Sequence, residues 1–558
     1  MAKRLAITIS GAVSLGSYEA GVLWEILNAI RQHNDNPLTE LDNRIHVDVL
    51  TGASAGGMTA IILGQKLLYS GDQFQGPYNN PLYNCWVKRI SLQGLQDTQR
   101  DEPALHSIFS SDLIEQISRE TLMDRYKSAP VLPAMPHVAA APTIRIGVAL
   151  TNLNGVNYGL TVQPEGKFIY IRYVDQMTRV ADGAASDNQE FWEPLRQAAV
   201  ACGAFPFAFR TQDMERSART EPQDYPAENL MPWDNDPQTF TYTDGGVFQN
   251  QPLGMAKNMV DEIDQHQDQE NRFYLFVSPN AKDTEANDNF HEENADYVHL
   301  LLRLISVIFG QAGFQDWITA EGLNDRIKLF DKRADELKDA ILARKIDVEC
   351  LQKTATAILS LFFENGVHKS PGAAQPEALA DALARIANQY QEEMEALKGI
   401  PGAQQAFRDS VLAFETAAGL GARDKMTIYG VTAMDSELAG AGLEAFLGFF
   451  DQIFRDHDYD VGRTHARRFL NNPVISQPGG IGPLNLDANQ PAIRPIEHRL
   501  DGLRLSHVPV GDLAQFKNGA KDRVNEMLKE LIGNWSIVAD PVGDRLLSAG
   551  LDLLISKS

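Results

Sequence analysis

Cysteine is scarce in this chain, and its spacing excludes two kinds of scaffold. The 558 residues contain three cysteines, Cys85, Cys202 and Cys350, which lie too far apart for a disulfide framework or a CxxC zinc site. This usage suits a reducing compartment, so we expect a cytoplasmic protein, either free or peripheral at a membrane. No H-E-x-x-H pattern or matched ligand cluster accompanies the histidines, so we expect no metal.

Long apolar runs and an excess of positive charge are also missing. A membrane-spanning helix needs about 20 apolar residues, whereas Val298 to Phe309 is shorter and contains Arg303. Lys and Arg number 50 against 74 Asp and Glu, which gives a formal charge of −24. An acidic surface repels phosphate backbones, so we expect no nucleic-acid partner. Tight electrostatic adsorption to anionic bilayers is disfavoured too, while a local basic or apolar patch leaves transient membrane-surface contact open.

Short apolar runs bounded by turn residues predict buried strands in the first 285 residues. These runs are Leu5–Ile9, Val47–Leu50, Ile144–Leu150 and Phe273–Val277. Helical patterns lie between them, at Ala20–Ile30 and Met58–Leu68. Strand–helix alternation predicts an α/β domain over 1–285, with a mostly parallel central sheet and helices on both sides.

The rest of the chain has a different pattern. Apolar residues recur at steps of three and four across 286–424, which predicts an α-helical insertion carried by the core. Residues 425–558 are expected to return to the core, beginning with a strand at Met426–Val431 and a helix near Gly442–Phe454. The region 471–499 is rich in Pro, Gly and Asn, which indicates a connector, and Leu546–Ile555 predicts a closing helix.

The central chemical motif is the G-x-S-x-G sequence Gly52-Ala53-Ser54-Ala55-Gly56. It lies between a predicted strand and a predicted helix, which is the setting of a nucleophile elbow. The free amides and dipole at the helix start favour the negative charge that develops during acyl transfer. A Gly/Ser turn without catalytic function is the alternative interpretation of this motif alone.

Two further motifs flank the first in the chain. Residues 10–16, Ser-Gly-Ala-Val-Ser-Leu-Gly, follow the first strand, and such a loop presents backbone N–H groups to an anion. Val13 stands where dinucleotide binding needs its middle glycine, so that function is disfavoured. The third motif is Asp244-Gly245-Gly246 at a predicted strand end, a pattern that an ordinary turn also produces.

Taken in order, these motifs resemble those of the patatin-like phospholipases. Ile146–Asn152 is similar to that family's strand ending in A-T-D, and Ala198–Pro206 to its A-S-x-x-x-P block. The resemblance covers about 1–285 and, more weakly, 425–470. It implies a three-layer α/β/α sandwich of patatin type, and it leaves the helical insertion unaccounted for.

The resemblance also implies a function: a lipid acyl hydrolase of the phospholipase A, lysophospholipase or esterase type. Ser54 would be the nucleophile of a catalytic dyad and Asp244 its general base. The oxyanion hole would be formed by main-chain amides of Gly11, Ala12 and Val13, with Ala55 as an extra donor. The motif glycines are Gly16, Gly52, Gly56, Gly245 and Gly246. The substrate would be a lipid or another acyl ester, with no cofactor, and the oligomeric state stays open.

This chain departs from the family pattern in its first loop. Ala12 and Val13 replace two glycines, and a positive φ at either position would cost roughly 1–2 kcal/mol of strain. Leu15 occupies the place of a common Arg or Lys, which suggests that a charged phospholipid is not the preferred substrate.

Two alternatives remain open. One is an α/β-hydrolase with a Ser–Asp–His triad, which needs a late histidine among His457, His465, His498 and His507. The other is a catalytically impaired binding or scaffolding protein on the same fold, motivated by the altered first loop. Of the remaining features, we expect ordinary polar roles for His457 and His465, a packed thiol at Cys202, and a surface loop at the acidic stretch 211–240.

Overall fold

A computed structural model of the protein describes most of the chain. The described residues are 2–96, 106–127, 131–161, 167–227, 229–264, 271–279, 290–291, a few positions between 300 and 312, 329–363, 367–368, 377–417, 427–441, 445–477 and 479–495. Most of Val298–Phe309 and all of Leu546–Ile555 lie outside them, as do His498 and His507. Among the described residues, no helix combines the length and apolarity needed to cross a bilayer.

The described chain divides into two compact units. One comprises Met1–Ala256, Asn271–Asp316 and Ile428–Ser558, and the other Lys257–Glu270 and Trp317–Thr427. We call them the α/β unit and the helical unit. The domain boundaries at 285 and 424 stay a prediction.

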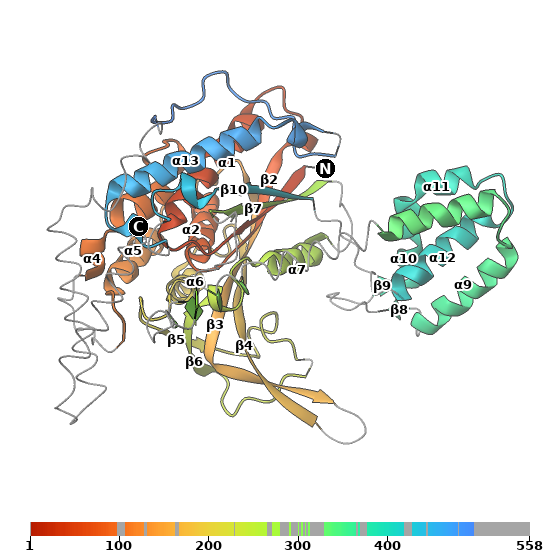
Figure 1. The fold of residues 1–558 in the computed structure, drawn as a ribbon, viewed down its shortest axis with the longest axis horizontal. Coiled ribbons are helices and arrows are strands. Elements are labelled where there is room, and N and C mark those ends of the chain that lie inside the picture. The colour runs from red at the N-terminus through yellow and green to blue at the C-terminus, as the bar shows by residue number, and fades with distance from the viewer. Residues whose placement is uncertain are drawn as a thin grey trace. The chain divides into compact units, whose positions relative to one another are not determined.

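The α/β unit is built on an eight-stranded mixed sheet (Figure 1). The strand order is β10-β7-β1-β2-β3-β6-β5, with β4 paired to β3. The strands are β1 Lys3–Ile9, β2 Ile45–Gly52, β3 Ala140–Thr161, β4 Lys167–Asp182, β5 Gln212–Arg216, β6 Gln238–Asp244, β7 Arg272–Ser278 and β10 Ile428–Thr432. The pairs from β10 to β3 are parallel, whereas β4 and β6 run antiparallel to β3. The predicted fold class, a mostly parallel sheet flanked by helices, is confirmed.

Helices flank this sheet and bury its apolar residues. They are α1 Gly16–Asp35, α2 Ala55–Tyr69, α3 Pro81–Tyr83, α4 Leu92–Gln96, α5 Asp112–Leu122, α6 Gln189–Cys202 and α13 Gln452–Leu470. Helix α7, Leu253–Asp264, begins in the α/β unit, and its residues from Lys257 on belong to the helical unit. Strands β1, β2 and β7 are buried along nearly their whole length, as expected of parallel strands covered on both faces.

Glycines bring α1 and α13 into close contact. A Cβ on Gly21 would lie 2.1 Å from the Tyr459 carbonyl oxygen, and one on Gly462 would lie 2.2 Å from that of Tyr18. Arg463 on α13 donates to Glu25 on α1 at 2.9 Å, with both side chains buried. Helix α13 is therefore an integral part of the α/β unit.

The helical unit has its own apolar core. It contains α9 Val348–Phe362, α10 Leu379–Gln389, α11 Gln391–Ala396 and α12 Ala403–Ala417, with a further helix at 329–342 and a short pair of strands, β8 Val367–His368 and β9 Glu377–Ala378. Its core side chains include Ile341, Leu359, Ile386 and Phe407. The additional helical region expected from the period-3.6 pattern is therefore present.

Two expectations about single elements are wrong. The helix predicted near Gly442–Phe454 is α13, which begins only at Gln452, where the Asp451 side chain caps it. A short 3-10 helix at Leu447–Phe449 precedes it. The stretch 211–240 is not simply a surface loop, because Gln212–Arg216 forms a strand paired with β6. The connector predicted after residue 470 holds only a 3-10 turn at Pro473–Ser476 in its described part.

Candidate active site

Ser54 lies on a sharp turn between the carboxyl end of β2 and the first residue of α2. Its backbone has φ 51° and ψ −128°, a conformation that is strained for a non-glycine residue. The neighbouring glycines have no room for side chains: a Cβ on Gly52 would lie 2.3 Å from the Gly56 carbonyl oxygen, and one on Gly56 would lie 2.3 Å from that of Ser10. This is the geometry of a nucleophile elbow, which exposes a serine hydroxyl above a sheet.

The Ser54 hydroxyl donates a hydrogen bond to Asp244, the last residue of β6. The distance from Oγ to Oδ2 is 2.6 Å, and the other oxygen, Oδ1, accepts the Gly246 N–H at 2.7 Å. Asp244 is fully buried and Ser54 nearly so. Burial raises the pKa of Asp244 to about 7, against the opposing effect of the two hydrogen bonds. A carboxylate with that pKa is matched to proton transfer near neutral pH.

Backbone and side-chain contacts fix Asp244 in this position. Its N–H donates to the Ala204 carbonyl at 3.0 Å, which also accepts the Thr243 hydroxyl at 2.7 Å. The Thr151 hydroxyl on β3 donates to the Asp244 carbonyl at 2.8 Å. Two stretches that resembled family motifs, Ile146–Asn152 and Ala198–Pro206, therefore both contact the strand end that carries Asp244.

The loop after β1 lies beside the elbow and contributes Val13. Val13 has φ 48°, so the positive φ considered from the sequence does occur, at a β-branched residue for which it is costly. The amides of Ala12, Val13 and Ala55 have no hydrogen-bond acceptor within the described part of the chain. Val13 and Ala55 line the same pocket as Ser54, which suits them to hold an oxyanion.

The expectation for Gly11 is wrong in one respect. Its N–H donates to the Asn250 carbonyl at 3.0 Å, so this amide ties two loops together and is not aimed at a substrate. Leu15 is buried in the core, so that position offers no group to a lipid head.

Asn250 was not singled out from the sequence, although it helps to build the site. Besides accepting the Gly11 N–H, its side chain lies where a Cβ on Gly11 would be, at 1.9 Å from Oδ1. Nothing in the sequence marks this residue, because its role depends on the loop after β6 meeting the loop after β1.

Ser54 opens into a pocket whose wall is mostly apolar. Its lining residues come from the elbow, α2, α5, α6 and the segments around them: Val13, Ser54, Ala55, Met58, Trp86, Ile90, Ser111, Ile114, Val200, Gly203, Phe205, Phe209 and Phe449. Such an apolar wall keeps water away from a charge that develops beside Ser54.

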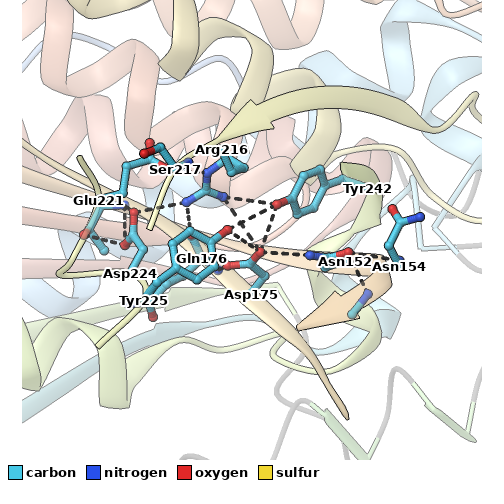
Figure 2. A network of polar contacts seen from close by, with 12 residues as sticks. Asn152, Asn154, Asp175, Gln176, Arg216, Ser217, Glu221, Asp224, Tyr225 and Tyr242 are labelled. Atoms are coloured by element: carbon cyan, nitrogen blue, oxygen red, sulfur yellow. Dashed lines mark hydrogen bonds and ion pairs between the residues drawn. The ribbon is translucent and has the colours of Figure 1, made fainter. Parts of the chain in front are cut away.

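A buried polar network includes Tyr242 of β6 (Figure 2). Arg216 at its centre is fully buried, and it donates to Glu221 at 2.7 Å and to Asp224 at 3.2 Å. Two of the acidic residues that gave 211–240 the pattern of a surface loop thus neutralise a buried arginine. A buried guanidinium needs such partners, because an unpaired charge in the interior is costly.

The other half of the network joins this segment to β3, β4 and β6. Asp175 on β4 accepts hydrogen bonds from Tyr225 at 2.8 Å and Tyr242 at 2.9 Å, and Asn152 on β3 donates to it at 3.4 Å. Tyr242 lies two residues before Asp244 on the same strand. The network therefore holds β6, the strand that ends at Asp244, in place through Tyr242 (Figure 2).

The described histidine candidates, His457 and His465, and the thiol of Cys202 lie in ordinary structural positions. His457 is buried against Asp458 at 3.1 Å, and His465 contacts the Tyr18 hydroxyl and the Thr432 carbonyl. Cys202 is buried beneath the elbow, where its Sγ lies 3.6 Å from the Ser54 carbonyl, and burial raises its thiol pKa. No group of potential metal ligands occurs in the described residues.

Comparison with known proteins gives a family match for the N-terminal part of the α/β unit. Residues 7–257 match the family model described as patatin-like phospholipase, which confirms the resemblance seen in the motifs. An uncharacterized protein of Sinorhizobium fredii is 22% identical over 327 residues, covering 45% of this chain and 45% of that protein. An uncharacterized membrane protein of Mycobacterium tuberculosis is 26% identical over 338 residues, covering 54% of this chain and 29% of that protein. The chain thus spans less than half the length of either relative.

Proposed function

We propose, from the premise that residues 7–257 form a patatin-like phospholipase domain, that the protein is a serine hydrolase that cleaves acyl esters of lipids. Ser54 is the nucleophile and Asp244 the general base. The observation that carries this proposal is the 2.6 Å hydrogen bond from the strained Ser54 to a buried carboxylate. The three free cysteines support the cytoplasm as the compartment.

The proposed reaction uses one base for two steps. Asp244 takes the Ser54 proton as Oγ attacks the acyl carbonyl, and the amides of Val13 and Ala55, with Ala12, stabilise the oxyanion. Asp244 then protonates the departing alcohol, which leaves an acyl-enzyme at Ser54. Water attacks this ester while Asp244 accepts its proton, and the fatty acid departs as Ser54 is reprotonated.

A direct dyad is favoured over a Ser–Asp–His triad by the distance between the two side chains. In a triad the imidazole lies between serine and carboxylate, whereas 2.6 Å from Oγ to Oδ2 leaves no space for a ring. No histidine contacts Ser54 or Asp244 in the part of the chain that the structure describes.

Hydrolysis of a panel of lipid esters by the full-length protein tests the proposal. We expect Ser54→Ala and Asp244→Asn to lose at least about a thousandfold in kcat/KM, because each removes a group that acts in both steps. Ser217→Ala and Asp213→Asn are matched controls on and beside β5 and should stay within about twofold. An organophosphonate should label the wild type at Ser54. Retained hydrolysis in Ser54→Ala would overturn the assignment, and failure to label Ser54 would favour a binding or scaffolding protein.

The panel should also pair neutral with anionic esters of the same acyl chain. Leu15 is buried and apolar, so that position has no cation to attract a charged head group. We therefore expect faster hydrolysis of the neutral ester. A clear preference for the anionic ester would contradict this expectation.

A further inference from the structure

The hairpin of β3 and β4 extends beyond the rest of the sheet and exposes a run of apolar side chains. Figure 1 shows the two strands continuing past the helices of the α/β unit. We call the extension, Leu153–Gly159 with Phe168–Tyr173, the arm. Its exposed large apolar residues are Leu153, Phe168, Ile169, Tyr170, Ile171 and Tyr173, with exposed fractions from 38% to 63%. Exposed apolar side chains that gather on one short element, instead of being scattered singly, indicate an interaction site.

The arm is an ordered part of the fold. Its strands pair in register through Tyr158 and Tyr170, whose rings stack at 5.8 Å between centroids. On the other side of β3, the Gly159 N–H donates to the Asn229 carbonyl at 2.7 Å and the Met231 N–H to that of Asn157 at 3.0 Å. Strand β4 pairs only with β3 in the described part of the chain. Side chains of Arg216 and Asp224 bond its outer backbone groups at Gln176 and Thr178, so the available part of its outer edge is the arm segment Phe168–Tyr173.

The arm projects from the same end of the sheet as Ser54, where the parallel strands have their carboxyl ends. Strands β2 and β3 are parallel, with Gly52 level with Val148, and Ser54 follows two residues after Gly52. Strand β3 continues beyond Val148 in the same direction, so the arm begins roughly 16 Å past that level. A surface that the arm touches therefore faces the edge at which the nucleophile lies.

The arrangement of side chains indicates what kind of surface this is. Successive strand residues point to opposite faces, so Phe168 and Tyr170 lie on one face and Ile169, Ile171 and Tyr173 on the other. A protein docked on one face would leave the other exposed, whereas entry into a lipid–water interface covers both. Tyrosines suit the head-group level, where the ring is apolar and the hydroxyl stays hydrated.

The charge of the arm and its backbone groups also favour a lipid–water interface as the partner. The described arm contains no Asp or Glu in a chain of formal charge −24, and Arg172 lies on it over the Tyr158 ring. A cation among aromatic residues complements the phosphate of a lipid head group. The edge of β4 has backbone groups that need water or another hydrogen-bond partner, so the arm fits the interfacial layer and not the hydrocarbon interior.

We propose that the arm docks the protein on a lipid surface and so presents that surface to Ser54. This inference rests on the proposed function, which supplies the lipid substrate. Docking is mainly apolar, so it does not require anionic lipid.

Vesicle binding by the catalytically silent full-length Ser54→Ala protein tests the docking. Sedimentation with phosphatidylcholine vesicles should show binding that persists in 1 M salt, because apolar contacts are not screened. Adding Phe168→Thr and Ile171→Thr removes one apolar side chain from each face but keeps β-propensity, and should weaken binding at least about tenfold. The double substitution Leu38→Thr with Leu41→Thr is the matched control. These leucines are 83% and 71% exposed, but they precede the amino end of β2, at the end of the sheet opposite to the arm. The control should bind within about twofold of its parent.

Several outcomes would overturn the docking proposal. They are absence of vesicle binding, equal binding by the arm variant, or sedimentation velocity showing that the arm holds two copies of this chain together. The proposed function is tested separately with a short, water-soluble ester and active protein, on which the arm substitutions should have no effect. Arm-dependent vesicle binding without any ester hydrolysis would contradict the enzyme assignment but not the docking proposal. Ester hydrolysis without vesicle binding would contradict the docking proposal but not the enzyme assignment.

Discussion

At the scale of single residues, the proposed role of Asp244 as general base links catalysis to pH. Its carboxylate must be ionised to accept the Ser54 proton, and burial raises its pKa to about 7. We therefore expect kcat/KM for a neutral ester to rise tenfold per pH unit below pH 7 and to level off above it. Asp213→Asn, a change at an exposed carboxylate on β5, should leave the profile unchanged. A profile already flat at pH 5 would show that the reaction does not depend on a base with this pKa.

The same burial makes Asp244 costly for stability. The folded-state pKa lies above the unfolded value of about 3.9, so the wild type loses free energy of unfolding as pH rises from about 4 through about 7. The asparagine side chain of Asp244→Asn cannot ionise, so this variant avoids the loss. The loss is on the order of 4 kcal/mol at most for a carboxyl pKa raised from about 4 to about 7. Thermal melts at pH 5 and pH 8 should show the variant's advantage growing with pH. An advantage that is larger at pH 5 would contradict the assigned pKa shift.

At the scale of elements, Arg216 holds β4, β5 and β6 together beneath the site. Arg216→Met would leave Glu221, Asp224 and Asp175 buried without their central cation, and we expect a loss of about 3–5 kcal/mol in the free energy of unfolding. Arg179, whose side chain is 20% exposed, also makes ion pairs to Glu221 and Asp224. Because Arg216 would still pair with both carboxylates, Arg179→Met should cost less free energy of unfolding than Arg216→Met.

The pH dependence of unfolding tests whether unpaired buried carboxylates cause the loss of stability in Arg216→Met. Burial raises the pKa of Asp224 to about 6 even beside two arginines, so lowering the pH neutralises carboxyl groups that Arg216→Met leaves unpaired. Denaturant unfolding of the variant and the wild type should therefore differ less at pH 5 than at pH 8. An equal deficit at both pH values would point to lost packing and not to unpaired charge.

The elements also show what sequence could and could not predict. Buried parallel strands, the elbow at Ser54 and the strand end at Asp244 follow from local apolar runs and glycine spacing, because each depends on neighbours in the chain. The Arg216 network does not, since the acidic residues at 221 and 224 resemble solvated charges until β5 pairs with β6. Asn250 could not be predicted from local sequence either, because its partner, Gly11, lies 239 positions away in the chain.

At the scale of the whole molecule, the α/β unit is completed by residues far beyond the family match at 7–257. Strand β10 pairs with β7, and α13 packs on α1, where Arg463 neutralises the buried Glu25. A chain ending at residue 285 would keep every motif of the proposed catalytic site but expose this face of α1. We expect such a chain to show no cooperative thermal unfolding and no ester hydrolysis.

A substitution in the full-length protein separates this loss of packing from truncation itself. Gly462→Ala places a methyl group 2.2 Å from the Tyr18 carbonyl oxygen, so α13 must move away from α1, and we expect a loss of about 2 kcal/mol or more. Gly183→Ala is the matched control, because its Cβ would meet only the Pro142 carbonyl oxygen at 3.5 Å, an ordinary contact. Chemical denaturation of the two variants measures the difference. If the truncated chain unfolds cooperatively and Gly462→Ala is no less stable than Gly183→Ala, the C-terminal layer is an accessory, and the family-matched segment folds without it.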